Sequence, residues 1–240
     1  MPPRLAAPLR RASAIAGVLT TLAALVAMPA LLESQPLGSV TGSVKVARPP
    51  AAPAPTKVTR QMDVCGSTVA SDAVVTGPGN TLAATAVWLE GVARRAGVEG
   101  RDVTLDQRRC RFEPRVQTAT VGSTLLVTSR DRVLHNVHGF VGNRTLFNIA
   151  VPVPGMTIRK QLSQAAHIRF QCDAGHNWMA AHVWVFDHPY HATSAVDGTF
   201  RIPDVPPGTY RWKAWHERLG EKTASVTVAA GQAVRVTIQY

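Results

Sequence analysis

The sequence predicts an all-β fold made of small sandwiches. Short apolar runs are separated by turn residues such as Gly, Pro, Asn and Asp, which is typical of antiparallel strands. Apolar residues nowhere recur at helical spacing over three turns with a cap at each end. Hydrophobic residues make up 45% of the 240 positions and charged residues 17%, so the chain has enough apolar residues for buried cores.

The first 36 residues are expected to be a targeting segment. Arg4, Arg10 and Arg11 precede a stretch, 12–32, that is almost wholly apolar or small, and this is the layout of a secretory signal. The stretch is also long enough, at roughly 20 residues, to span a bilayer, so an uncleaved N-terminal anchor is the alternative. We therefore expect an exported protein, in the periplasm or another extracytoplasmic location.

The middle of the chain predicts a series of strands. Residues 39–46 (SVTGSVKV) alternate as a strand does, and a Pro- and Ala-rich connector follows over 49–55. Further apolar, strand-like runs lie at 85–92, 121–128, 147–153, 168–172 and 182–186. We divide this part of the chain into an N-terminal β extension, 37–83, and a larger β-sandwich, 84–189.

The last fifty residues show the clearest alternation. Tyr210, Trp212 and Ala214 alternate with Arg211 and Lys213. The runs 223–228 and 234–240 alternate in the same way, and turn signals such as Asp-Gly and Pro-Pro-Gly separate them. This pattern predicts a smaller, antiparallel C-terminal sandwich over residues 190–240, with one face of each sheet buried.

A polar loop between two apolar runs carries three potential metal ligands. Cys172, His176 and Met179 lie in QCDAGHNWMAAHVWVF. A thiolate, an imidazole and a thioether suit a soft metal, and two His, one Cys and a weak axial Met are the ligands of blue-copper sites. The second imidazole must come from elsewhere, and His135 and His138 in the upstream segment TSRDRVLHNVHGF are the candidates.

The cysteine count is odd. Cys65, Cys110 and Cys172 are the three cysteines, and in an oxidising compartment exposed thiols tend to pair. All three pairings are open on the sequence alone. Because Cys172 has a use as a metal ligand, we expect Cys65 and Cys110 to form a structural bridge and Cys172 to stay free.

Residues 84–189 resemble the cupredoxin (plastocyanin-like) family. The resemblance rests on VGSTLLVTSRDRVLHNVHG followed by C-x₃-H-x₂-M. It implies a Greek-key β-sandwich with a type 1 copper site, in which the first ligand is the histidine of the H-N step, His135, with His138 as its competitor. The resemblance then assigns the remaining ligands, which are Cys172, His176 and Met179.

The resemblance also indicates what to expect at two further positions, 136 and 168. Asn136 matches the family's asparagine beside the first ligand, which ties the two ligand loops together by hydrogen bonds. The related binuclear purple copper site also ends in C-x₃-H-x₂-M, but it requires a second cysteine four residues before Cys172. Ile168 occupies that position, so the expected centre holds one copper ion.

The C-terminal region resembles a different family. Residues 191–240 contain DGTF followed by PPGTY, and this pattern is similar to the D-G-x-F and P-x-G-x-Y signature of the carboxypeptidase regulatory-like (transthyretin-like) β-domain. The resemblance implies an appended module without catalysis of its own.

An electron carrier is the function that these features predict, and we expect no substrate turnover at the copper site. A periplasmic or surface copper-binding carrier and a structural β-protein with a vestigial site are the alternatives. Zinc is the rival metal, although it rarely recruits Met. A nucleophilic Cys172 paired with His176 is disfavoured, because Asp173 adjoins the cysteine and is poorly placed to orient the imidazole.

Four other histidines fall near the junction of the two predicted sandwiches. They are His182, His188, His191 and His216. Packing and hydrogen bonding between the domains is the expected role of these side chains. A second metal site or a proton-sensitive interface is the alternative.

The chain carries a formal net charge of +11. Export argues against nucleic acid as the partner of this basic surface, because cellular nucleic acid lies on the other side of the membrane. The arginines at 108, 109, 111 and 115 are expected to steer an acidic partner protein, to lie near anionic lipid or to form a solvated strand edge.

Overall fold

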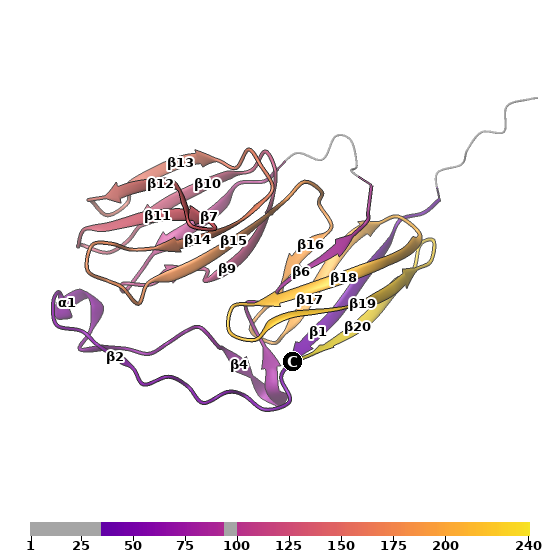
Figure 1. The fold of residues 1–240 in the computed structure, drawn as a ribbon, viewed down its shortest axis with the longest axis horizontal. Coiled ribbons are helices and arrows are strands. Elements are labelled where there is room, and N and C mark those ends of the chain that lie inside the picture. The colour runs from indigo at the N-terminus through magenta and orange to yellow at the C-terminus, as the bar shows by residue number, and fades with distance from the viewer. Residues whose placement is uncertain (1–34, 94–99) are drawn as a thin grey trace, which may run out of the picture. The chain divides into compact units, whose positions relative to one another are not determined.

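The computed structural model describes residues 35–93 and 100–240. The predicted targeting segment, 1–36, lies almost entirely outside the described residues. Within them the regular secondary structure is almost wholly β-strand (Figure 1), which confirms the all-β prediction. No helix among the described residues is long and apolar enough to cross a membrane.

The first sandwich is built from two sheets. One sheet has the order β13 (Thr157–Gln161), β10 (Thr124–Ser129), β7 (Val103–Gln107) and β8 (Phe112–Glu113). The other has the order β12 (Arg144–Val151), β11 (His135–Val141), β14 (Ala166–Gln171), β15 (Ala180–Phe186) and β9 (Val116–Thr120). The chain changes sheet between β10 and β11 and again between β12 and β13, as in Greek-key sandwiches.

The pleat of β11 decides which of its histidines faces the core. Successive side chains of a strand point to opposite faces of the sheet. His135 and Val137 are buried on one face, whereas Asn136 and His138 lie on the other and are only partly buried. The core on the first face contains Val137, Phe170, Cys172 and Met179.

The second sandwich also has two sheets. One has the order β17 (Thr199–Val205), β1 (Gly38–Lys45), β5 (Thr81–Leu82) and β4 (Thr76–Gly77), with β20 (Ala233–Gln239) beside β1. The other has the order β16 (His191–Thr193), β6 (Ala86–Glu90), β18 (Gly208–His216) and β19 (Gly220–Val228). A core of its own lies between them.

The strands of the second sandwich come from both ends of the chain, unlike the predicted division at 83/84 and 189/190. β1, from the predicted N-terminal extension, pairs in parallel with β20 and antiparallel with β17. β6, from the predicted larger domain, pairs with β16 and β18. Alternation in the last fifty residues identifies strands with one buried face, but it does not show which distant strands complete their sheets. The second sandwich is therefore larger than predicted and not wholly antiparallel.

The turn before β17 requires both Asp197 and Gly198 of the DGTF motif. Gly198 has φ of 74°, and a Cβ there would lie 2.5 Å from the carbonyl oxygen of Val44. The Asp197 carboxylate accepts hydrogen bonds from the backbone N–H of Thr199 at 2.9 Å and from its hydroxyl at 2.7 Å. Only glycine fits this positive φ beside a neighbouring strand without a clash.

A partly buried ion-pair network joins the two sandwiches. Arg115, just before β9, donates to Glu217, just after β18, with a Nε–Oε2 distance of 2.7 Å, and it also donates to the Asp72 carboxylate. Burial raises the pKa of Glu217, but hydrogen bonds from His182 and Arg115 and the charge of Arg115 outweigh it and lower the pKa to about 2. Arg115 is therefore committed to this network and is not part of a free basic surface.

Acid is expected to destabilise the fold through its buried histidines. Burial lowers the pKa of His216, which is fully buried, from its ordinary value of about 6.5 to about 4. The unfolded chain therefore binds the proton more readily than the native protein between these two pH values, so stability falls as the pH drops through this window. We expect the protonation of His216 alone to make the free energy of unfolding about 2 kcal/mol lower at pH 4.5 than at pH 7.

Urea denaturation at pH 4.5, 5.5 and 7 measures this loss. In the variant His216→Asn the difference in unfolding free energy between pH 7 and pH 4.5 should shrink by that amount. An unchanged pH profile in the variant would show that His216 is not one of the groups responsible.

An extended arm leaves the second sandwich and reaches the first. It contains a two-stranded ribbon, β2 (Thr56–Lys57) and β3 (Thr68–Val69), a single helical turn, α1 (Met62–Cys65), and a 3₁₀ turn, η1 (Pro78–Asn80), which leads into β5. Figure 1 shows α1 at the far end of this arm. Cys65 is bonded to Cys110 in the turn between β7 and β8, whereas Cys172 is free and buried. The expected pairing is thus confirmed.

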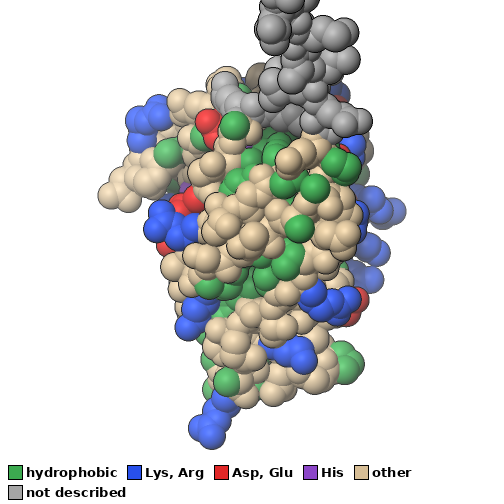
Figure 2. Space-filling model, turned by 90° about the vertical axis from the view of Figure 1, so that its right-hand side faces the viewer, with side chains coloured by type: hydrophobic (Ala, Val, Ile, Leu, Met, Phe, Trp, Pro, Cys, Tyr) green, Lys and Arg blue, Asp and Glu red, His purple; other side chains and the backbone are tan. Residues whose placement is uncertain are grey.

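Basic side chains are prominent on the surface. On the face drawn in Figure 2, which is the right-hand side of Figure 1, Lys and Arg side chains are more conspicuous than Asp and Glu side chains. This distribution agrees with the net positive charge of the chain.

Candidate metal centre

The strand pairing brings the predicted ligands to one end of the first sandwich. β11 and β14 run antiparallel, and His138 in β11 lies opposite Gln171 at the end of β14. The first residue of β11, His135, therefore lies beside Cys172, which directly follows β14. The loop from β14 to β15 carries His176 back toward both residues.

Three donor atoms converge on one buried point. The Nδ1 atoms of His135 and His176 are 3.1 Å apart. The Cys172 sulfur lies 3.6 Å from Nδ1 of His176 and 3.9 Å from Nδ1 of His135. All three side chains are at most 3% exposed. A thiolate and two imidazoles in this arrangement are a suitable donor set for a soft transition metal.

The outer nitrogen of each imidazole is held by a different side chain. Nε2 of His135 lies 2.9 Å from a carboxylate oxygen of Asp131, and Nε2 of His176 lies 2.6 Å from the side-chain oxygen of Gln61. Each oxygen accepts a hydrogen bond from the adjacent Nε2–H. The lone pairs of both Nδ1 atoms are then directed toward Cys172, because a neutral imidazole carries only one N–H.

The distances between these donor atoms show whether one metal ion can bind them together. Two nitrogen lone pairs 3.1 Å apart repel each other unless a proton or a metal ion lies between them. Metal–nitrogen bonds of about 2.0–2.1 Å and a metal–sulfur bond of about 2.3 Å, as zinc forms, would separate the donors by roughly 3–4 Å. The observed separations lie in this range, so the three residues fit one metal ion.

The ionisation of the two histidines is consistent with such a site. Burial alone lowers the pKa of His135, but hydrogen bonds and charge from Asp131 and Cys172 outweigh it and raise the pKa above its usual value. Burial and the neighbouring His135 lower the pKa of His176. The two shifts are in opposite directions, so the two rings differ in how readily they take up a proton, and a bound cation would compete with protons for their Nδ1 atoms.

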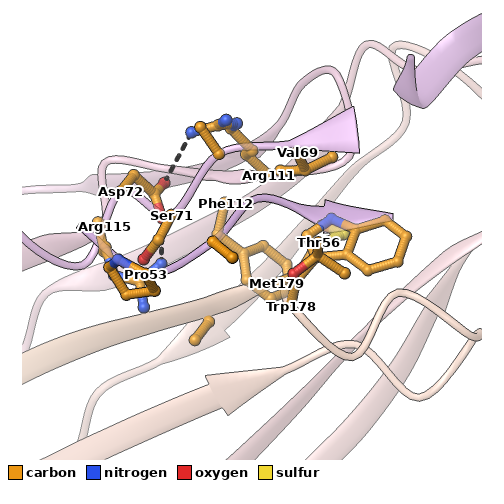
Figure 3. Close-up of a pocket in the computed structure, with 13 residues that line it drawn as sticks. Pro53, Thr56, Val69, Ser71, Asp72, Arg111, Phe112, Arg115, Trp178 and Met179 are labelled. Carbon is orange, nitrogen blue, oxygen red and sulfur yellow. Dashed lines mark hydrogen bonds and ion pairs between the residues drawn. The ribbon is translucent and has the colours of Figure 1, made fainter. Parts of the chain in front are cut away.

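Met179 closes the turn that carries His176. Its backbone N–H donates to the His176 carbonyl at 2.9 Å, and its side chain is buried in the same core cluster as Cys172. Together with Trp178 it lines a cavity of about 200 Å³, which Thr56 and Val69 of the extended arm also line (Figure 3). Met179 thus lies at the same end of the sandwich as the three other predicted ligands, but the contacts of the described residues bring together only His135, Cys172 and His176 and not the Met179 sulfur.

Asn136 and His138, on the opposite face of β11, do not point into the site. The side-chain oxygen of Asn136 accepts hydrogen bonds from the backbone N–H groups of Asp173 at 2.6 Å and Ala174 at 3.1 Å. It therefore ties the loop after Cys172 to β11, as the resemblance implied. The ring of His138 lies against the Asp173 carboxylate at 2.6 Å and Thr145 at 2.9 Å, so His138 does not compete with His135 in this structure.

These positions predict opposite results for two alanine substitutions on one strand. His135→Ala is expected to lower copper affinity at least about 100-fold, because it removes a ligand and leaves the Asp131 carboxylate buried without its partner. His138→Ala is expected to leave affinity within a fewfold of the wild type. Competition titrations with a copper chelator measure both. Equal losses in the two variants would contradict the assignment.

The junction histidines pack and form hydrogen bonds, as expected. Nε2 of His167 lies 3.1 Å from Nδ1 of His182, and the His167 ring stacks on Trp184 with centroids 4.3 Å apart. Nε2 of His191 lies 3.0 Å from the Thr120 hydroxyl. Within the described part of the chain, the groups of three or more possible His, Cys, Asp or Glu ligands all lie at the metal end and include none of the junction histidines.

Two residues of the site were not predicted from the sequence. Asp131 lies four residues before His135, and this spacing is its only local signal in the sequence. Gln61 is 115 residues away from His176 in the chain, and no motif of the sequence marks it.

Solved structures of copper proteins are similar to part of this chain. A purple cupredoxin from Nitrosopumilus maritimus is 20% identical, and the match covers 35% of this chain and 98% of that chain with a TM-score of 0.31. A mutant of amicyanin in its Cu(I) form is 18% identical over 41% of this chain and 97% of that chain, with a TM-score of 0.31. A copper-containing nitrite reductase (NirK) from Thermus scotoductus SA-01 is 18% identical, and the match covers 35% of this chain but only 22% of that chain, also with a TM-score of 0.31.

Comparisons of sequence identify the C-terminal region. No curated protein sequence matches this chain. The matching family model is that of the carboxypeptidase regulatory-like domain, and it covers residues 173–240, from the metal loop through β15 to the last strand of the second sandwich.

Proposed function

We propose that this protein binds one copper ion through His135, Cys172, His176 and Met179 and carries single electrons in an extracytoplasmic compartment. One observation carries the proposal. The two inward-facing Nδ1 atoms and the Cys172 sulfur lie 3.1–3.9 Å apart at a buried point. A metal ion satisfies all three donors at once, and the number of donors suits one ion rather than two.

The donor types favour copper. A thiolate, two imidazoles and a thioether are the donors of the trigonal site with a weak axial ligand that is typical of blue-copper proteins. When bound, copper would supply a one-electron couple between Cu(I) and Cu(II). We expect Cys172 to be the thiolate ligand, the histidines to be equatorial ligands and Met179 to be the weak axial donor.

The surrounding residues favour electron transfer over ligand exchange. Asp131 and Gln61 fix the two imidazole rings from outside, and Asn136 fixes the loop that follows Cys172. Buried ligands held by hydrogen bonds keep the same positions in both oxidation states, and they exclude water from the site. We therefore expect the centre to pass electrons without turning over a substrate of its own.

The partner is expected to be an acidic redox protein. Arg108 and Arg109 are exposed in the same turn as Cys110, whose sulfur lies near His176. Exposed positive charge at the metal end would increase the rate of encounter with a negatively charged partner, and this increase would weaken at high salt.

Voltammetry of the copper-loaded protein separates this function from its alternative. An electron carrier gives a reversible one-electron wave at one copper per chain. A copper-binding carrier without a redox role would bind Cu(I) tightly and show no reversible couple, which would overturn the electron-transfer proposal. Elemental analysis of the same sample identifies the metal and excludes or establishes zinc.

A further inference from the structure

We infer that Gln61 is a positioning residue of the metal centre, which holds His176 with Nδ1 facing inward and shields the outer edge of its ring from water. This inference rests on the proposed function for its copper, but not for the geometry of the metal-free site. It assigns a role in the centre to the extended arm that precedes the first sandwich.

The contact between Gln61 and His176 is specific. The side-chain oxygen of Gln61 lies 2.6 Å from Nε2 of His176. His176 is only 2% exposed, whereas Gln61 itself is exposed. Gln61 is therefore the outermost layer over this imidazole, and truncating its side chain would open the Nε2 edge to solvent.

The local backbone directs this side chain toward the site. Gln61 is the residue before α1, with φ of 58° and ψ of 35°, and its side chain does not cap the helix. Its carbonyl instead accepts the N–H groups of Val64 and Cys65. The helical turn is thus satisfied by the backbone alone, and the amide group is available to His176.

The arm is anchored on both sides of Gln61. Val58 and Val69 are buried in the core of the first sandwich, and the N–H of Val58 donates to the carbonyl of Ser67 at 3.0 Å. Cys65, four residues after Gln61, is bonded to Cys110. Both of these sulfur atoms lie within 4.8 Å of a ring nitrogen of His176. The same arm lines the cavity beside Met179 (Figure 3), so it covers the site on two sides.

The two histidines are held in matching but unequal ways. Asp131 supports His135 with a carboxylate, and it also accepts the backbone N–H groups of Arg109 and Cys110, each at 2.7 Å. Gln61 supports His176 with a neutral amide. Cys110 connects the two supports, since its N–H binds Asp131 and its sulfur holds the helical turn that follows Gln61. A neutral acceptor withdraws less of the Nε2–H proton than a carboxylate does, so it makes the imidazole a weaker donor.

Three variants of the full chain test the inference. Gln61→Ala removes the acceptor, and Gln61→Glu keeps an acceptor but makes it anionic. Met62→Ala is the matched control, because Met62 is the next residue in the arm and is 55% exposed. All three change exposed side chains, and circular dichroism establishes that each has folded.

The first readout needs no copper. Long-range ¹H–¹⁵N correlation spectra of the metal-free, histidine-labelled protein report which ring nitrogen of His176 carries the proton. We expect a single tautomer with the proton on Nε2 in the wild type, in Gln61→Glu and in Met62→Ala. In Gln61→Ala we expect a mixture of tautomers. A wild-type spectrum for Gln61→Ala would overturn the inference.

The second readout uses the loaded protein. We expect a Cu(I) chelator to remove copper at least about tenfold faster from Gln61→Ala than from the wild type or Met62→Ala, and we expect Gln61→Glu to lower the reduction potential. Identical removal rates in the wild type and Gln61→Ala would contradict the shielding role. If the chain takes up no copper while the tautomer still depends on Gln61, the proposed function fails and the positioning role stands. If the chain takes up copper normally, and neither Gln61→Ala nor Gln61→Glu changes the copper removal rate or the reduction potential, the positioning role alone fails.

Discussion

Replacing Cys172 with serine is expected to abolish the intense visible absorption of the copper-loaded protein. That absorption arises from charge transfer between a thiolate and Cu(II), and a serine hydroxyl at the same position cannot supply it. Cys172 is 3% exposed and lies within 4 Å of both imidazole Nδ1 atoms. We also expect copper affinity to fall by at least about 100-fold, because the remaining donors are two imidazoles and a thioether.

Visible spectra recorded at one equivalent of Cu(II) measure this effect. Cys172→Ser is close to the wild type in size, so circular dichroism and thermal unfolding should show an intact fold. His188→Ala is the control, since its ring stacks on Phe186 at 5.5 Å near the junction of the sandwiches and belongs to no donor group. Retention of the intense band in Cys172→Ser, or its loss in His188→Ala, would refute the assigned role of Cys172.

Removing the Cys65–Cys110 disulfide is expected to cost about 4 kcal/mol of unfolding free energy. The bridge closes a loop with a sequence separation of 45 residues, and the chain-entropy relation gives this magnitude for a loop of that length. The double variant Cys65→Ala, Cys110→Ala would also release the arm that carries Gln61. We therefore expect His176 to become more accessible than it is in the wild type.

Guanidinium denaturation of the double variant and of the wild type measures the loss. The wild type treated with a thiol reductant should approach the stability of the double variant. Cys172→Ser leaves the bridge intact, so its free energy of unfolding should not fall to that of the double variant. A loss below about 1 kcal/mol in the double variant would mean that the arm is held by its buried valines and not by the bridge.

Much of the candidate site could be predicted because its residues lie close together in the chain. Cys172, His176 and Met179 share one loop, so their spacing alone indicates a metal site. His135 could be preferred to His138 only through the H-N step of the resemblance, and the pleat of β11 gives the physical reason. Gln61 could not be predicted, because its contact with His176 depends on how a distant arm folds back over the sandwich.

The fold was predictable in class but not in its connections. The alternation around Tyr210 and Trp212 marks a half-buried strand, and β18 is such a strand. The same alternation gives no information on its neighbours, and β6 is paired with β18 across more than a hundred residues of chain. Strand pairing depends on the packing of whole faces, so a local period of two cannot specify which distant strands complete a sheet.

The visible absorption spectrum of the purified protein during titration with Cu(II) tests the central claim most directly. The arrangement of His135, Cys172 and His176 predicts an intense blue or green band that grows to saturation at one copper ion per chain. A protein that stays colourless, or that binds zinc in place of copper, would contradict a mononuclear copper centre at these residues.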